Sequence, residues 1–482
     1  MKEERQVKLK NYLAYGCGDF YGGGAFLIIS TLFIFFLTKV EHISPAMAGF
    51  IVFVGKAWDA VSDPLFGIIS DRTESKWGRR RCYFLWGAIP VGVSFFFLWI
   101  TIANPSVTVK ALYYLFAYIL LCTAYTFVMV PYNALAAEMS GDYQVRTRLS
   151  GFKMFFSQLS ALIAGTIPGY LINNVYKDNP SKGFLLIGVL FGVLYTIPWF
   201  IVFFGTWEND TAPSETVSLG QSFKELYTLL DNKTFRTHIS MYLLAYTAMD
   251  ILSASIIYYV SYYLGRKNIY TLLLGGMLLS QLVFLPIYLH MANKKGKGFS
   301  YLVGAGILTV TMATFLVIPR NASLPLLLCF SILMGAGFSA VISMPYAMLP
   351  ESSDVEELLR GRARTGTLTG MFTLMRKLIQ AVVLWLFGIL LSTIGFNGTL
   401  DSQAPSTVMG IKLLFSLAPV ACMLAAFIIG FRYPVTPKRF ELAKSELERI
   451  RNGGKKENVD DATAREIEIL TGHPYGQNAT CV

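Results

Sequence analysis

The chain has 482 residues, of which 54% are hydrophobic and only 15% are charged, and its formal net charge is +11. Soluble domains carry about 25% charged residues, and a soluble fold of this length cannot hide so much apolar surface in its core. The composition therefore predicts an all-α polytopic membrane protein. The basic residues cluster in short gaps between apolar runs, which favours the positive-inside bias of a membrane protein over nucleic-acid binding.

Twelve segments are long and apolar enough to be spanning helices, which need about 20 mostly apolar residues each. In chain order they are expected near residues 14–39, 45–70, 82–103, 109–138, 150–174, 184–206, 235–264, 269–292, 299–319, 322–349, 366–395 and 406–432. The pattern predicts four regions: an N-terminal six-helix bundle (1–206), a cytoplasmic connector (207–234), a C-terminal six-helix bundle (235–432) and a cytoplasmic tail (433–482). In the tail, residues 438–451 are predicted to form a short charged helix, and the rest is expected to be solvated.

Basic residues are concentrated in one set of loops. Residues 72–81 alone carry five, and the first ten residues carry four. Such loops face the cytoplasm, and with an even number of spans both termini are then cytoplasmic. The expected location is the cell membrane.

The two halves of the chain share a local pattern. Pro131 and Tyr132 end the fourth span and Glu138 follows, while a Pro-Tyr pair ends the tenth span and Glu351 follows. Equivalent features in two six-helix halves are typical of a duplicated transporter.

The second span carries the strongest group of ionisable residues. Lys56, Asp59 and Asp63 lie at i, i+3 and i+7 and therefore share one helix face. Charged residues inside a span are costly and mark function by default. Two carboxylates one turn apart need Lys56, a proton or a metal cation to neutralise them, and hydroxyls such as Ser62 and Thr126 would complete an oxygen site. The alternative is a fixed ion pair that only holds helices together.

Other ionisable residues lie in the first, fifth, seventh and eleventh spans. Asp19 precedes three consecutive glycines, which permit close helix approach or a bend, and it either faces the cavity or is interfacial. Asp250 lies mid-span. Lys153 and Lys377 are interpreted as cavity residues, whereas Arg376 is expected to snorkel or to pack.

The loop after the second span combines a helix-end acid with basic residues. Asp71 and Arg72 are followed by Gly78 and Arg79. Charge pairs here can latch a cytoplasmic gate and break when the two halves move, although the same residues are also explained by positive-inside charge alone.

These motifs resemble a known family. The Gly-x-x-x-Asp-Arg and Gly-Arg-Arg elements between the second and third spans resemble the major facilitator signature. Residues 58–64, with Trp58-Asp59 and Asp63-Pro64, are similar to the hallmark of its glycoside–pentoside–hexuronide:cation symporter branch. The resemblance extends to about residue 432 and implies two six-helix bundles around a central cavity that carry out Na⁺- or H⁺-coupled symport of a sugar, glycoside or hexuronide.

The resemblance also assigns roles to particular residues. It implies that Asp59 and Asp63, with Ser62 and Thr126, bind the coupling cation. Asp19, Thr373 and Lys377 match sugar-binding positions of the family. The full set of expected substrate-binding residues is Asp19, Tyr132, Asn133, Lys153, Tyr346, Thr373 and Lys377, with Lys56 and Asp250 as supporting charges.

Two departures from the family pattern concern the sugar. Met129 and Asn133 stand in the fourth span where the family pattern has an acidic residue and a stacking Trp. With fewer acids beside Lys153 and Lys377, the cavity suits an anionic sugar such as a uronide, which is a hypothesis at this stage.

Other functions fit the sequence less well. A symporter of the same fold for a lipid-like or peptide-like solute remains the main alternative, because function resides in the site rather than the fold. An enzyme is not expected, since the four histidines show no metal spacing and no Ser-His-Asp arrangement. No cofactor beyond the coupling cation is expected, and a monomer in the lipid membrane is the expected functional unit.

Overall fold

The computed structural model of the chain describes residues 7–103, 106–140, 143–208, 228–361 and 364–476. Among these residues, nine helices are long and apolar enough to cross a membrane, and α5 (Arg81–Phe97) is a shorter apolar helix. Two further helices, α4 (Pro45–Arg72) and α12 (Lys297–Thr314), complete a set of twelve spanning elements. The predicted all-helical polytopic fold is confirmed.

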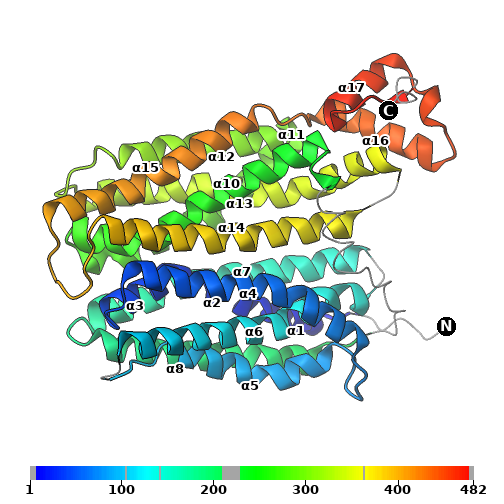
Figure 1. Cartoon of the computed structure of the whole chain (residues 1–482). Helices are drawn as coiled ribbons and strands as arrows, with labels where there is room; N and C mark the ends of the chain where they lie inside the picture. Colours follow the sequence, from blue (N-terminus) through cyan, green and yellow to red (C-terminus); the bar gives the residue numbers. More distant parts are fainter. Residues whose placement is uncertain (1–6, 104–105, 141–142, 209–227, 362–363, 477–482) are drawn as a thin grey trace.

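The first six spanning elements form one bundle, at the bottom of Figure 1. The first of them is composite and consists of α1 (Leu9–Cys17), α2 (Asp19–Ile28), a π-helical turn (Ile29–Phe33) and α3 (Ile34–Lys39). The others are α4, α5, α6 (Val107–Met139), α7 (Tyr143–Tyr170) with a π-helical turn (Leu171–Val175), and α8 (Pro180–Gly205).

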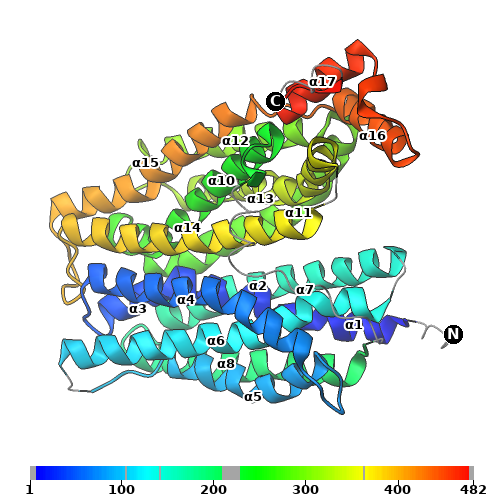
Figure 2. The ribbon, with the colours of Figure 1, turned by 45° about the vertical axis from the view of Figure 1, so that its right-hand side comes forward.

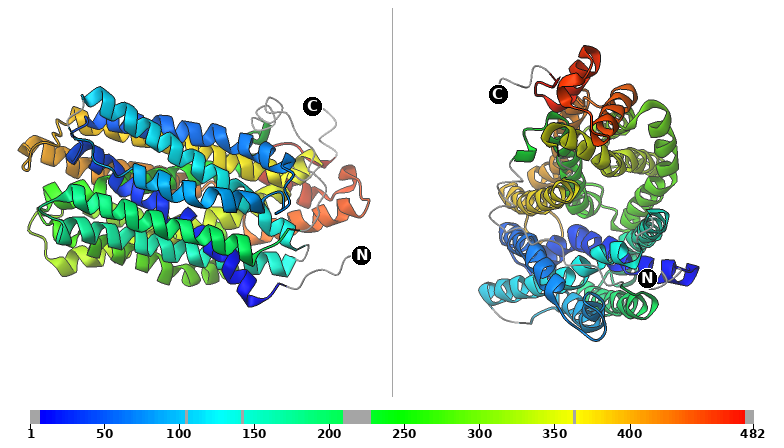
Figure 3. Two further views of the ribbon diagram at one scale, coloured as in Figure 1. Left: turned by 90° about the horizontal axis from the view of Figure 1, so that it is seen from below. Right: turned by 90° about the vertical axis from the view of Figure 1, so that its right-hand side faces the viewer.

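The second six spanning elements form the other bundle, and the end-on view in Figure 3 separates the two groups of helices. They are α10 (Lys233–Tyr258) with a π-helical turn (Tyr259–Tyr263), α11 (Tyr270–Lys295) after a short 3₁₀ turn (Lys267–Ile269), α12, α13 (Leu324–Arg360), α14 (Thr365–Thr393) and α15 (Pro405–Gly430). α13 extends 11 residues beyond its predicted end at residue 349. Its last turns are polar, and a prediction based on apolar residues does not include them.

Both ends of the described chain lie at the same end of the two bundles (Figure 1). We call this end the terminal face. The other end, which carries the loops around residues 40–44, 98–103, 176–179, 264–266, 315–323 and 394–404, is called the opposite face.

The two bundles are closest at the opposite face (Figure 2). There α4 packs on α14 so closely that a Cβ at Gly49 would lie 3.1 Å from the Cα of Gly388, and Thr38 of α3 is hydrogen-bonded to Tyr258 of α10 at 2.9 Å. Toward the terminal face the ribbons of the two bundles diverge (Figure 2).

The glycines of the first span permit close helix approach, which is one of the two outcomes that the sequence predicts. A Cβ at Gly23 would collide with the backbone of Ser157 in α7, and one at Gly24 would collide with the hydroxyl of Ser160. The Ser160 hydroxyl donates to the carbonyl of Phe20 at 2.5 Å, so the absence of side chains lets α2 and α7 meet through polar contacts.

The residues after Arg432 fold onto the C-terminal bundle, so the expectation of a solvated tail is wrong for the described part. The predicted helix is present as α16 (Pro437–Arg451), and α17 (Asp461–Thr471) follows. Ile467 and Leu470 are fully buried, and the hydroxyl of Thr234, just inside α10, donates to the carbonyl of Leu470 at 2.7 Å. The predicted region boundaries stay predictions, since residues 209–227 of the connector lie outside the described part.

Candidate functional site

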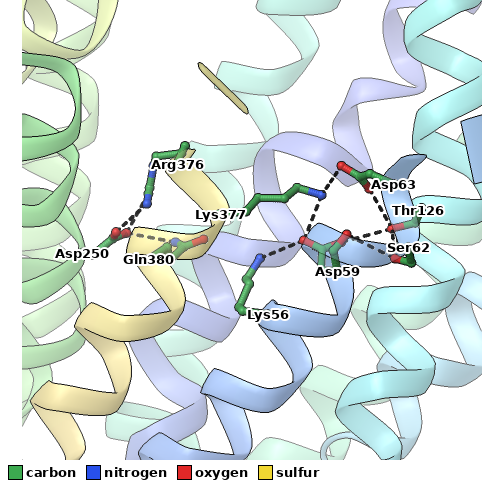
Figure 4. Close-up of polar contacts among 9 residues, drawn as sticks. All are labelled: Lys56, Asp59, Ser62, Asp63, Thr126, Asp250, Arg376, Lys377 and Gln380. Atoms are coloured by element: carbon green, nitrogen blue, oxygen red, sulfur yellow. Dashed lines mark hydrogen bonds and ion pairs between the residues drawn. The ribbon is translucent and has the colours of Figure 1, made fainter. Parts of the chain in front are cut away.

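Charged side chains of the spanning helices gather in three groups near the middle of the molecule. Figure 4 shows two of them, one around Asp59 and one around Asp250. The third surrounds Asp19. Because ionisable residues at this depth carry a large insertion cost, their pairing identifies the candidate site.

The first group joins α4 and α6 through oxygen atoms. The Thr126 hydroxyl lies 3.1 Å from Oδ1 of Asp59 and 3.0 Å from Oδ1 of Asp63, and the Ser62 hydroxyl lies 3.1 Å from that of Thr126. Asp59, Ser62 and Thr126 are fully buried. Pro64 has no N–H for the carbonyl of Ala60, which leaves one more oxygen on this stretch of α4. Carboxylate, hydroxyl and carbonyl oxygens are ligands that suit a hard cation.

Two ammonium groups balance these carboxylates. Lys377 of α14 reaches across from the other bundle, with its Nζ 2.5 Å from Oδ2 of Asp63 and 3.0 Å from Oδ2 of Asp59. Lys56 Nζ is 3.6 Å from Asp59 Oδ2 and lies over the ring of Phe26, 3.0 Å from its centre. The sequence offered Lys56, a proton or a metal cation as the neutralising group and placed Lys377 at the substrate. In the structure the shorter contacts come from Lys377, which is 314 positions from Asp63.

The second group joins Asp250 of α10 to α14. The Arg376 guanidinium donates to both oxygens of Asp250, at 2.7 and 2.8 Å, and Gln380 Nε2 donates to Oδ1 at 2.9 Å. Of the two roles expected for Arg376, snorkelling is wrong, because a bidentate pair with Asp250 holds the guanidinium between α14 and α10. The sequence does contain a signal for this group. Asp250 lies in the middle of one span, and Arg376 and Gln380 lie one turn apart on another, where their side chains share a helix face.

The third group lies on the N-terminal bundle. Lys153 Nζ of α7 is 4.0 Å from Asp19 Oδ1 and donates to Asn133 Oδ1 at 2.5 Å. Tyr132 is fully buried, and its hydroxyl donates to the carbonyl of Tyr15 at 2.8 Å. Lys153 lies over the Tyr132 ring, 5.3 Å from its centre. The buried Tyr132 ring therefore supports this group through its contact with Lys153.

The two remaining substrate candidates lie on the C-terminal bundle. Thr373 is exposed one turn from Lys377 on α14, and its hydroxyl donates to the carbonyl of Thr369 at 3.1 Å. Tyr346 of α13 is 53% exposed, and its hydroxyl is 3.1 Å from that of Tyr242. The side chains of Thr373 and Tyr346 are therefore both exposed.

A cavity of about 210 Å³ lies between the bundles beside the second group. Both bundles contribute polar side chains to its wall, including Ser30, Gln158, Asp250, Gln281, Arg376 and Gln380. A larger hollow of about 530 Å³ lies at the terminal face beside Lys8, Lys10 and Trp207, away from these charges. Of these two spaces among the described residues, the 210 Å³ cavity is the one that combines apolar walls with convergent polar groups, which is the pattern of a small-molecule site.

The expected gate residues form charge pairs within the N-terminal bundle. Asp71 pairs with Arg80 at 2.5 Å, and Arg79 pairs with Glu138 of α6 at 2.8 Å. Arg80 also contacts Glu138. Gly78 adopts a φ of +103°, which lets the loop turn at that point. Asp71 of α4, Arg79 and Arg80 before α5, and Glu138 of α6 therefore brace the three helices together.

The C-terminal bundle has a counterpart of this arrangement. Glu351, which matches Glu138 in the sequence repeat, pairs with Lys297 at the start of α12, at 2.9 Å. Both acids therefore hold a basic residue at or just before the start of the third helix of their bundle, as expected from a duplicated fold.

Comparison with known proteins identifies the fold and the family. The D-xylose-proton symporter crystal structure superposes with a TM-score of 0.62 at 14% identity, covering 86% of this chain and 96% of that one. The fold is therefore that of the major facilitator transporters. Residues 14–437 match the model of the MFS/sugar transport protein family, and the chain belongs to this family.

Two bacterial relatives match over nearly their full lengths. The chain is 30% identical to the uncharacterized symporter YjmB of Bacillus subtilis (strain 168), covering 91% of this chain and 95% of that protein. It is 26% identical to the putative glycoside/cation symporter YagG of Escherichia coli (strain K12), covering 95% of this chain and 99% of that protein.

Proposed function

We propose that this chain moves a sugar or glycoside across the cell membrane together with a cation, Na⁺ or H⁺, by alternating access. The observation that carries the proposal is the buried oxygen cluster of Asp59, Asp63 and Thr126 on the N-terminal bundle, which is bridged by Lys377 from the C-terminal bundle. A cation site that spans the interface between two moving halves is the arrangement that coupling requires. The named relatives, which are symporters, support the same reading.

The geometry supplies a coupling mechanism. A cation that binds both carboxylates must displace the Lys377 ammonium, because that group lies within 3.0 Å of each of them. Two neighbouring carboxylates without countercharge, one fully buried (Asp59) and one partly buried (Asp63), are costly in a low dielectric, so either the cation or Lys377 has to neutralise them. Cation binding therefore releases Lys377 toward the substrate, and the state of the cation site controls the sugar site.

The sugar site draws hydrogen-bonding groups from both bundles. Asp19, Asn133 and Lys153 lie on the N-terminal bundle, and Thr373 and Tyr346 lie on the C-terminal bundle. None of these five is among the residues that line the 210 Å³ cavity, whose wall instead offers Ser30, Gln158, Gln281 and Gln380. Sugar hydroxyls bind to carboxylate, amide and hydroxyl groups of this kind, which accept and donate hydrogen bonds in fixed directions. A substrate that contacts both walls draws the bundles together when it binds.

We assign the terminal face to the cytoplasm, because the loops there hold the basic clusters, such as the five basic residues of 72–81. Both termini are then cytoplasmic, and the observed conformation is open toward the inside. In this orientation Asp71, Arg72, Gly78 and Arg79 lie at the cytoplasmic end, where they hold the helix pair α4–α5 as a unit during the transition.

Uptake of labelled sugars into membrane vesicles tests the proposal. Vesicles with an imposed Na⁺ or H⁺ gradient are expected to accumulate a glycoside, and Asp59→Asn is expected to abolish the gradient dependence. Asp178→Asn, in an exposed loop of the opposite face, is the matched control and should behave as wild type. Normal coupled uptake in Asp59→Asn would refute the assignment of the cation site to Asp59. If the wild-type protein accumulates no sugar at all, a different cargo is favoured.

A further inference from the structure

The cavity of about 210 Å³ between the bundles is closed toward the opposite face by the crossing of α7 and α11. Added Cβ atoms at Gly165 and Gly169 of α7 would collide with Leu278 and Tyr270 of α11, so the two helices are in tight contact there. Leu278 also lines the cavity. Because α7 and α11 belong to different bundles, the floor of the cavity is a point where the bundles touch.

Two glutamines lie beside this crossing, on its terminal-face side. Gln158 of α7 lies about two turns before Gly165, and Gln281 of α11 lies about one turn after Leu278. Both glutamine side chains line the cavity and are half-buried. Each bundle therefore contributes one side-chain amide to the same part of the wall.

These two amides have hydrogen-bonding groups to spare. Within the described part of the chain, the side chains of Gln158 and Gln281 form no hydrogen bond, whereas Gln380 on the same wall donates to Asp250 at 2.9 Å. A side-chain amide carries two donors and an acceptor oxygen with two lone pairs. Unpaired polar groups are costly in lipid and are tolerated where they face a cavity that supplies partners. Both amides are therefore available to a solute in the cavity.

The chemistry of this wall suits hydroxyl groups. The oxygen and the NH₂ of an amide lie side by side, so one glutamine accepts from one hydroxyl of a ring and donates to the next. The cavity is smaller than the about 300–1,000 Å³ of pockets for drug-sized ligands, which suits a single ring. A lipid-like solute would cover both amides without pairing them, at a cost in affinity. The charged residues of the wall, Arg376 and Asp250, already neutralise each other.

We propose that Gln158 and Gln281 bind the hydroxyl groups of one sugar ring from opposite bundles, as a subsite at the floor of the cavity. The inference rests on the proposed symport and deepens it by naming two substrate-binding residues. Gln158 lies five positions beyond Lys153 along α7, so the subsite is deeper than the group around Asp19 by more than one turn. Opening of the opposite face requires α7 and α11 to part, so the bound ring lies where the bundles move relative to each other.

Binding of methyl glycosides to purified protein, in saturating Na⁺ or at low pH, tests the subsite. Methyl β-D-glucoside, methyl β-D-galactoside and methyl β-D-xyloside are titrated by calorimetry. Gln158→Leu and Gln281→Leu keep a side chain of similar size without the amide, and each should weaken binding roughly 2- to 12-fold per hydrogen bond lost. Leu159→Ala and Leu282→Ala are the matched controls. They change exposed neighbours of the two glutamines that are not among the residues lining the cavity, and they should bind as wild type does.

Monodeoxy forms of a glycoside that binds show whether the amides touch the sugar. In wild type, removal of a hydroxyl that Gln281 binds should weaken binding, and in Gln281→Leu removal of the same hydroxyl should have no further effect. Gln158→Leu should cancel the effect at a different hydroxyl. A packing defect would instead weaken the parent glycoside and every deoxy form by one common factor. The cation affinity measured without sugar should equal that of wild type, because Asp59 and Asp63 are not among the residues that line this cavity.

The outcomes separate this inference from the proposed function. Unchanged glycoside binding in the double variant Gln158→Leu/Gln281→Leu, or deoxy effects that persist at every hydroxyl in both single variants, overturns the subsite and leaves sugar symport standing. Loss of cation affinity together with sugar affinity also overturns the subsite, because the glutamines would then act on the fold or on the cation site. Wild type that binds no glycoside overturns both proposals.

Discussion

Replacing Thr126 by Val is expected to weaken the activation of transport by the coupling cation. The Thr126 hydroxyl is fully buried and lies 3.1 and 3.0 Å from oxygens of Asp59 and Asp63. Val keeps the shape of the side chain and removes this single oxygen. An interaction between a hydroxyl and a charged partner contributes about 1.5–3 kcal/mol. At about 1.4 kcal/mol per factor of ten, the cation concentration for half-maximal uptake should rise roughly 10- to 100-fold.

The assay is the Na⁺ and H⁺ dependence of sugar uptake into vesicles at fixed substrate concentration. Thr126→Ser keeps the hydroxyl and should activate within a few-fold of wild type, which separates the loss of an oxygen from a packing defect. Equal amounts of protein in the membrane are verified for each variant. A half-maximal cation concentration in Thr126→Val equal to that of wild type would refute the placement of the cation beside Thr126.

Two other predictions concern the bundle interface and the tail. Gly388→Ala places a Cβ against Pro45 and Gly49 of α4 and should separate the bundles at the opposite face. A cysteine introduced at Thr38 should then react faster with an impermeant thiol reagent, whereas Gly370→Ala, whose Cβ would meet no atom within 4 Å, should leave the rate unchanged. Equal labelling rates with and without Gly388→Ala would argue against the interface. Leu470→Ala removes a fully buried side chain and should weaken the docking of the tail by about 2–5 kcal/mol. Limited proteolysis should then cleave the tail faster than in the control variant Ile469→Ala, which changes a more exposed neighbouring side chain. Equal cleavage rates in the two variants would contradict the docking.

The local part of the architecture follows from the sequence. The number of spans was readable because a membrane imposes a length of about 20 apolar residues on each helix. The grouping of Lys56, Asp59 and Asp63 on one face was readable because the helical period places i, i+3 and i+7 together. The three glycines of the first span indicated close helix approach or a bend for the same local reason, and the structure shows close approach, with α7 as the partner.

The tertiary structure decided which charges meet. The partner of Asp63 and Asp59 is Lys377, 314 positions from Asp63, and Arg376 pairs with Asp250 instead of snorkelling. The docking of α17 and the pairing of Asp71 with Arg80 were also beyond the pattern. Helical periodicity fixes the face on which a residue lies. It does not fix which other helix that face meets, because this depends on how the two bundles pack across many helices at once.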